Sequence, residues 1–128
     1  MKPVKEVNLE KPVVCKMSDK AIEVAKLIKN EKARHVLVVD EKGFPKGIIS
    51  TVDINNRIVA EGKDPSEATA EQIMTSPIMV KNAEDDLGEV YRTMMKQNIY
   101  SMPIVEAGKL KGLLTFNKAL EELTGGRE

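Results

Sequence analysis

Residues 47–53, GIISTVD, combine a glycine, two isoleucines, two hydroxyl side chains and a carboxylate. Isoleucines are typical of a strand, whereas a hydroxyl residue followed by an acid is typical of the start of a helix. Residues 112–118, GLLTFNK, have the same outline but end on Lys118, where the first copy has Asp53. The chain therefore contains the same strand-to-helix turn twice, with the charge at its end reversed.

The two turns belong to a longer internal repeat. Residues 11–16 match residues 76–81 at an offset of 65, and two predicted helices, 20–31 and 86–97, match at an offset of 66. Their apolar residues recur at i, i+3, i+4 and i+7, which places them on one face of an amphipathic helix. Insertions are confined to turns, as expected of a duplicated structural unit. A repeat of this size is marginally stable alone, so we expect the copies to share a core.

Each copy reads as strand, helix, strand, strand and helix. Residues 35–39, HVLVV, form a continuous run of β-branched and leucine side chains, which is typical of a strand covered on both faces. Turns containing glycine lead to the next strands, at 47–50 and 112–115. Short closing helices are expected at 54–60 and 117–123. These patterns predict an α/β fold made of two β-α-β-β-α repeats.

The first repeat is predicted over residues 1–61 and the second over residues 75–128. The segment 62–74 between them is polar and contains a proline, so we expect an exposed connection. At 128 residues the chain is long enough for one compact unit with a real core. Its 20 basic and 20 acidic side chains leave no net charge, so the bulk composition attracts neither nucleic acid nor a membrane surface.

Residues that carry reactive chemistry are sparse. The single cysteine, Cys15, excludes an internal disulfide and fits a reducing compartment. The start, MKPVKEV, lacks an apolar signal core, so we expect a cytoplasmic protein that does not span a membrane. One histidine and one cysteine supply neither a His–Cys metal set nor a nucleophile with its base, so we predict no enzyme and no metal site. The acids at 84–86 are expected to open a helix.

The repeat resembles the cystathionine β-synthase (CBS) domain family, whose members usually occur as tandem pairs. The resemblance rests on IMTSP at 73–77, on the paired hairpins at 38–50 and 102–115, and on the Gly-hydrophobic-hydrophobic-Ser/Thr-x-x-Asp turn. It implies two units packed through their sheets around a pseudo-twofold axis. In many members the clefts bind AMP, ADP, ATP or S-adenosylmethionine. Such pairs usually regulate another protein and are not themselves catalysts.

The turn that ends at Asp53 has a structural and a functional interpretation. With Ser50 as the N-cap, Asp53 occupies the third helical position, which is the place of the acid in a capping box. The resemblance implies that Asp53 also accepts hydrogen bonds from the two ribose hydroxyls, while Ser50 and Val52 line the phosphate end. Both roles can coexist.

The resemblance implies further ligand residues. Arg34 and His35, just before the buried strand, would meet phosphate, whereas the matching Tyr100 and Ser101 bring no formal positive charge. Each of these residues also has a plain structural interpretation, as a solvated cation or a core side chain. The remaining predicted contacts to the adenosine are Thr75, Pro77, Ile78, Met79, Ile99, Tyr100 and Pro103.

The second cleft would contain Val14, Ala33, Thr115 and Lys118, and we expect it to be empty because a lysine cannot accept a hydrogen bond from ribose. The sequence thus predicts a regulatory module with one adenosine ligand per chain, AMP or ADP favoured, and no other cofactor. A homodimer is expected from apolar residues beside the helix stripes, Ile22, Leu27 and Met95. The regulated protein is not identified. The alternative is a ligand-free module that only dimerises.

Overall fold

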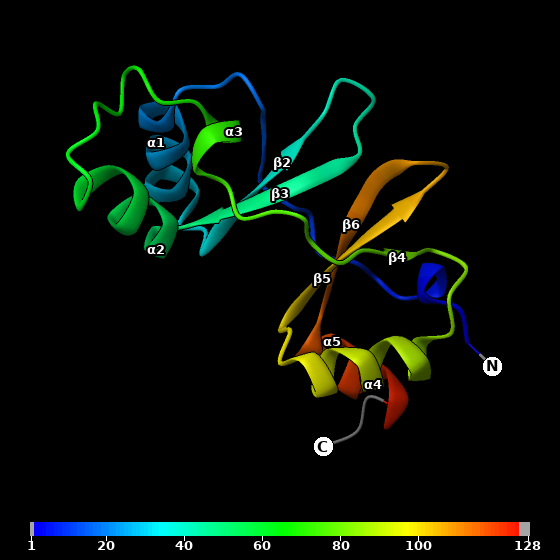
Figure 1. The fold of residues 1–128 in the computed structure, drawn as a ribbon. Coiled ribbons are helices and arrows are strands. Elements are labelled where there is room, and N and C mark those ends of the chain that lie inside the picture. Colours follow the sequence, from blue (N-terminus) through cyan, green and yellow to red (C-terminus); the bar gives the residue numbers. More distant parts are fainter. Residues whose placement is uncertain (1, 126–128) are drawn as a thin grey trace. The chain divides into compact units, whose positions relative to one another are not determined.

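The computed structural model describes residues 2–125, which form two compact units (Figure 1). One unit is Pro12–Ile78, named here the Asp53 unit. The other, the Lys118 unit, combines the chain up to Lys11 with the chain from Met79 onward. Among the described residues, no helix has the length and apolar character that crossing a membrane requires.

The Asp53 unit contains a three-stranded sheet in the order β1-β2-β3, with β1 parallel to β2 and β2 antiparallel to β3. Figure 1 shows α1 and α2 next to each other beside this sheet. Its elements are β1 (Val14–Lys16), α1 (Ala21–Glu31), β2 (His35–Val39), β3 (Pro45–Ser50), α2 (Thr51–Ile54), the π-helical turn η2 (Asn55–Val59) and α3 (Ala70–Ile73).

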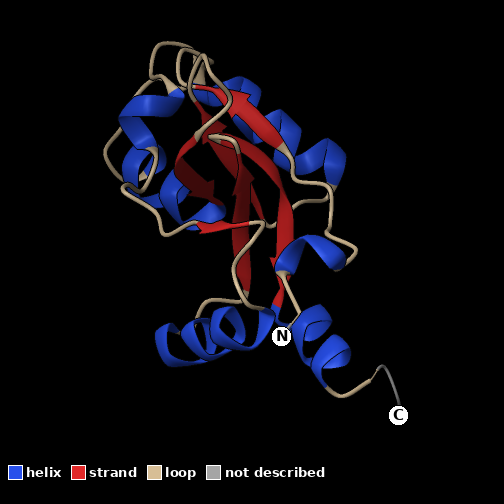
Figure 2. Cartoon of the chain, turned by 90° about the vertical axis from the view of Figure 1, so that its right-hand side faces the viewer, coloured by secondary structure: helices blue, strands red, loops and turns tan. Residues whose placement is uncertain are grey.

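The Lys118 unit repeats this topology in a sheet of order β4-β5-β6, with α4 and α5 side by side. Its elements are the 3-10 turn η1 (Val4–Glu6), β4 (Lys81–Asn82), α4 (Leu87–Gln97), β5 (Ser101–Glu106), β6 (Lys109–Thr115) and α5 (Phe116–Leu123). Figure 2 shows the helices of the chain in blue and its strands in red. The predicted α/β fold with two β-α-β-β-α repeats is confirmed.

Each unit has its own apolar core. In the Asp53 unit, Val36 and Val38 of β2 are fully buried together with Val24 of α1 and Ile49 of β3. The prediction that residues 35–39 form a buried strand is therefore confirmed. The corresponding core of the Lys118 unit contains, among others, Leu87, Met94, Met102, Ile104 and Leu114.

The first strand of each repeat is short. Residues 14–16 form β1, but in the second repeat only Lys81 and Asn82 pair as β4. Residues 76–80 lie outside any strand, and the Ser76–Pro77 peptide bond is cis. Proline has no backbone N–H to donate, which agrees with the lack of pairing around Pro77.

The prediction that 62–74 is an exposed connection is wrong for its second half. Ala68, Ala70 and Ile73 are buried in the core of the Asp53 unit. The helix α3 starts at a capping box formed by Thr69 and Gln72. The polar composition that suggested a linker is therefore partly that of a capped helix with one buried face.

The N-terminal segment occupies the same place in the Lys118 unit that the segment 68–75 occupies in the Asp53 unit. The backbone N–H of Leu87 donates to the carbonyl of Lys2 at 2.8 Å, as that of Ala21 donates to Ala68 at 2.8 Å. Two residues after Lys2, Val4 is fully buried. The compact units thus divide the chain differently from the sequence repeats 1–61 and 75–128.

Candidate functional site

The candidate site is built around the turn from β3 into α2. Gly47 in β3 has no room for a side chain, because an added Cβ would lie 2.8 Å from Met74 Cγ and 3.0 Å from the Thr75 carbonyl oxygen. This close approach lets Ile48 and Thr75 exchange two backbone hydrogen bonds, of 3.0 and 2.8 Å. The segment after α3 is therefore held alongside the strand that leads to Asp53.

The Asp53 carboxylate closes the turn from inside the helix. Ser50 is the N-cap of α2, and Ser50 and Asp53 form the predicted capping box. Oδ2 of Asp53 accepts hydrogen bonds from the Ser50 backbone N–H at 2.8 Å and from the Ser50 hydroxyl at 3.3 Å. Asp53 is only 8% exposed, although it is charged. These bonds explain how a nearly buried carboxylate is tolerated.

The other oxygen of Asp53 faces the segment after α3. Oδ1 accepts a hydrogen bond from the Thr75 hydroxyl at 2.8 Å. Arg57 Nε lies 3.8 Å from the same oxygen, and Arg57 Nη1 donates to the Met74 carbonyl at 2.9 Å. Each carboxylate oxygen can accept two hydrogen bonds, and Thr75 takes one position on Oδ1. Sequence reasoning had placed Thr75 at the site but had missed Arg57.

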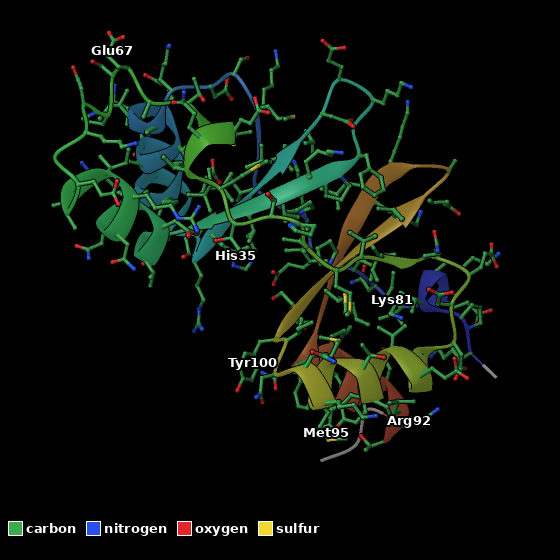
Figure 3. The ribbon with its side chains drawn as sticks, in the orientation of Figure 1. His35, Glu67, Lys81, Arg92, Met95 and Tyr100 are labelled. Atoms are coloured by element: carbon green, nitrogen blue, oxygen red, sulfur yellow. The ribbon has the colours of Figure 1, made fainter. Side chains whose placement is uncertain are left out.

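Arg34 and His35 reach the same end of the sheet. The β2–β3 register pairs His35 with Ser50, so the histidine begins its strand directly beside the N-cap of α2. Figure 3 shows His35 at this end of the Asp53 unit. Arg34 precedes it and is exposed, as is Val52, the second residue of α2. The structure thus brings these three residues together with Asp53 and Ser50 at one end of the sheet.

The other predicted contacts are divided between the units. Pro77 and Ile78 follow Thr75 at the end of the Asp53 unit. The remaining four belong to the Lys118 unit, in which Tyr100 is 72% exposed and contacts Phe116 edge-on at 6.3 Å (Figure 3). These four are Met79, which is exposed, Ile99, which packs against that unit's core, Tyr100, and Pro103, which is buried in β5.

The turn at Lys118 is built in the same way but with opposite charges. Thr115 is the predicted cap and accepts from the Lys118 backbone N–H at 3.1 Å. Lys118 Nζ lies 3.9 Å from a carboxylate oxygen of Glu122, one helical turn on, while Lys2 Nζ contacts Glu122 at 2.7 Å. The hydrogen bond from Lys2 lowers the pKa of Glu122 below its ordinary value. The charge of Lys118 is thus matched within its own unit.

The other two residues predicted for the second cleft, Val14 and Ala33, lie in the Asp53 unit, at the start of β1 and after α1.

Two further groups have structural roles. Asp86 is the N-cap of α4 and accepts from the Glu89 backbone N–H at 3.2 Å, so the prediction that the acids at 84–86 open a helix is confirmed.

Burial raises the pKa of the Cys15 thiol to about 12, which keeps it protonated. Among residues 2–125, no three His, Cys, Asp or Glu side chains are grouped as ligands of a metal ion.

The chain belongs to the CBS domain family, whose model matches residues 4–60 and 70–125. An uncharacterized protein of Methanopyrus kandleri is 31% identical over 105 residues, which are 81% of this chain and 54% of that protein. The L-aspartate semialdehyde sulfurtransferase of Methanocaldococcus jannaschii is 27% identical over 126 residues, 98% of this chain and 24% of that protein. The chain therefore spans about half of the first relative and a quarter of the second.

A solved structure resembles the chain over its whole length. The CBS domain pair of protein MJ0100, crystallised in complex with 5-methylthioadenosine and S-adenosyl-L-methionine, is 27% identical with a TM-score of 0.74. The match covers 100% of this chain and 99% of that one. The two-repeat architecture is therefore that of a CBS domain pair.

Proposed function

We propose that the chain is a regulatory module that binds one adenosine-containing ligand at Asp53 and signals through protein contacts. The observation that carries the proposal is the Asp53 carboxylate, 8% exposed, with its Oδ1 directed at the hydroxyl of Thr75. The similar CBS pair that holds 5-methylthioadenosine and S-adenosyl-L-methionine supports an adenosine ligand. AMP and ADP are favoured over ATP because Arg34 and His35 are the two basic residues proposed to meet phosphate, whereas Arg57 is engaged with Asp53 and the Met74 carbonyl.

Asp53 and Thr75 together offer two neighbouring acceptor oxygens that can bind two adjacent hydroxyl groups of a ligand. Because the Thr75 hydroxyl donates its proton to Oδ1, its own oxygen is left as an acceptor, 2.8 Å from the carboxylate oxygen. A ribose can then donate one hydroxyl to Asp53 and the other to Thr75. Hydrogen bonds to a charged group contribute about 1.5–3 kcal/mol, more than those between neutral groups.

The Lys118 turn is proposed to remain empty. A lysine offers ribose no acceptor, and Lys118 is already drawn toward Glu122 and Glu121, at 3.9 and 3.7 Å. Filling the second cleft would leave ribose hydroxyls poorly paired, at a cost of about 1–3 kcal/mol, or roughly tenfold or more in affinity. One ligand per chain follows.

The proposal includes a homodimer in the cytoplasm. Met95, 53% exposed on α4, is the strongest of the three residues on which the dimer was predicted (Figure 3). Leu120 and Leu123 of α5 are also exposed and extend the apolar surface of the same unit. Leu27 packs partly against the core of its own unit, so it supports a dimer less than its sequence position suggested. The regulated protein would contact such helical faces, and no catalytic role is proposed.

A ligand-free dimerisation module is the second candidate. It is favoured by the internal bonds of Asp53, since a carboxylate held by Ser50 and Thr75 has a structural reason to be present without any ligand. The two candidates differ in one property, which is whether adenosine compounds stabilise the fold.

A thermal-shift panel of AMP, ADP, ATP, S-adenosylmethionine and NADH tests the proposal. A ligand at about 100 times its dissociation constant adds about 2.7 kcal/mol to the free energy of unfolding, so a specific ligand raises the melting temperature clearly. AMP or ADP is expected to give the largest shift. A panel in which every compound leaves the melting temperature unchanged would favour the ligand-free module.

A further inference from the structure

We propose that Arg57 is a positioning residue of the Asp53 site and gives the site its preference for ribose over deoxyribose. This inference rests on the proposed function, because it assigns a role within the same ligand site. It concerns a residue that lies outside the strand-to-helix turn and bears on the ligand only through Asp53 and Thr75.

Arg57 contacts Asp53 and the backbone carbonyl of the residue before Thr75. Its Nε lies 3.8 Å from Asp53 Oδ1, the oxygen that also accepts from Thr75, and its Nη1 donates to the Met74 carbonyl at 2.9 Å. Met74 directly precedes Thr75 in the chain. One planar guanidinium therefore spans the carboxylate and the backbone that carries the hydroxyl, a geometry that suits the fixed fork of an arginine.

The local helix geometry supports this role. Arg57 follows Asp53 by four residues, so both side chains lie on the same face of the helix. It belongs to the π-helical turn η2, which continues α2 directly. Short π-helical turns inside helices occur frequently at functional sites.

Arg57 acts where the carboxylate is least restrained. Oδ2 of Asp53 is held by two donors of Ser50, so that side of the carboxylate is fixed by the capping box. Oδ1 keeps its direction through Thr75 and the nearby guanidinium. Removing Arg57 would release the Met74 carbonyl and the guanidinium beside Oδ1, so the carboxylate could turn relative to Thr75, whose backbone stays bonded to Ile48. The distance between Asp53 Oδ1 and the Thr75 hydroxyl oxygen, which must match the spacing of the two ribose hydroxyls, would then no longer be fixed.

A purely structural role of Arg57 would predict a loss of stability without a change in ligand selectivity, whereas the proposed role predicts the reverse. The Arg57 side chain is 46% exposed, and an ion pair at such a position contributes little to the free energy of unfolding. The loss of Arg57 should therefore leave stability nearly unchanged while altering ligand selectivity. The Lys118 unit offers a matched control, because Glu122 lies in the same relation to Lys118 and contacts Lys2 of the N-terminal segment.

The test measures the dissociation constants of AMP, 2′-deoxy-AMP, adenosine and 2′-deoxyadenosine by calorimetry on the full chain. The variants are Arg57→Ala, Arg57→Lys and the control Glu122→Gln, each with its melting temperature. Wild type should prefer each ribose ligand about tenfold or more over its deoxy counterpart. Arg57→Ala should reduce this preference at least threefold, mainly by weakening the ribose ligands.

The variants make the outcome decisive. Arg57→Lys keeps the charge but not the fork, so it should retain part of the preference even if Arg57→Ala folds poorly. Glu122→Gln should leave all four dissociation constants unchanged. An equal loss of AMP and 2′-deoxy-AMP affinity in Arg57→Ala, with adenosine unaffected, would show a direct phosphate contact and overturn the inference.

The inference and the proposed function fail in different ways. If wild type prefers ribose ligands and Arg57→Ala keeps the full preference, Arg57 does not position the site, while the proposed function stands. If wild type binds none of the four ligands, the proposed function is wrong and the inference falls with it.

Discussion

Replacing Asp53 with asparagine separates the role of this carboxylate in stabilising the fold from its proposed role in binding a ligand. The asparagine oxygen can take the place of Oδ2 and keep the bonds from Ser50, of 2.8 and 3.3 Å, at the strength of neutral hydrogen bonds. The amide nitrogen then faces Thr75 and cannot accept its proton. The Thr75 hydroxyl no longer donates to a carboxylate at 2.8 Å and can only accept from the amide, so a charge-assisted bond is replaced by a neutral one.

The magnitude follows from these contacts. The capping role alone accounts for about 1 kcal/mol, and a hydrogen bond to a charged group adds about 1.5–3 kcal/mol when its partner is lost. Thr75 is itself exposed and can turn its hydroxyl to water, which reduces the second contribution. We expect Asp53→Asn to lower the free energy of unfolding by about 1–3 kcal/mol while the fold survives.

The assay is urea unfolding followed by far-ultraviolet circular dichroism, with Asp86→Asn as the matched control. Asp86 caps α4 by accepting a hydrogen bond from the Glu89 backbone N–H at 3.2 Å, so its loss should cost no more than about 1 kcal/mol. In a double-mutant cycle, Asp53→Asn and Thr75→Val should be coupled by about 0.5 kcal/mol or more. Equal losses for Asp53→Asn and Asp86→Asn, without coupling to Thr75, would refute this reasoning.

Three other expectations concern stability and reactivity. Deleting the first eight residues removes Val4 and Val7 from the core of the Lys118 unit and should cost about 3–6 kcal/mol, measured by urea unfolding; a loss below 1 kcal/mol would contradict the assigned packing. Hydrogen bonds from the backbone N–H groups of Phe44 and Lys42 lower the pKa of Asp40 below its ordinary value of 3.8. The contribution of Asp40 to the free energy of unfolding is therefore complete above pH 3.8 and is lost as the pH falls through the lower pKa of the folded state. In an NMR titration, the amide resonances of Phe44 and Lys42 should shift with a midpoint below pH 3.8. The thiol of Cys15, with a pKa of about 12, should resist alkylation at pH 8 until urea unfolds the chain; rapid native labelling would show that it is accessible.

Sequence periodicity was sufficient for the architecture because each repeat has a local pattern. The helix stripe, the run at 35–39 and the cap at Ser50 all depend on residues close in sequence, and the structure confirms them. The N-terminal segment was missed because its match to 68–75 consists of little more than two apolar residues, Val4 and Val7, at helical spacing. Such a short pattern has no weight until the structure shows the shared backbone hydrogen bonds.

The site was predicted in part for the same reason. Ser50 and Asp53 lie three residues apart, and their capping box follows from that spacing. The bond from Thr75 spans 22 residues and depends on the close approach at Gly47, which only the fold reveals. Arg57 had a sequence signal, four residues after Asp53, that went unused.

The charge reversal at Lys118 also has a cause beyond the loss of a ligand contact. Glu122 stands where the first repeat has Arg57, so both members of the pair have exchanged charge. Both turns therefore keep an attraction across one helical turn. What differs is that only the turn with Asp53 presents a carboxylate beside a hydroxyl.

The most direct test of the central claim is the number of AMP molecules that bind to one chain, measured by calorimetry. Wild type should bind one AMP, Asp53→Asn should weaken it about tenfold or more, and Lys118→Ala should leave the stoichiometry and affinity unchanged. Two equal sites per chain, or undiminished binding by Asp53→Asn, would contradict the account.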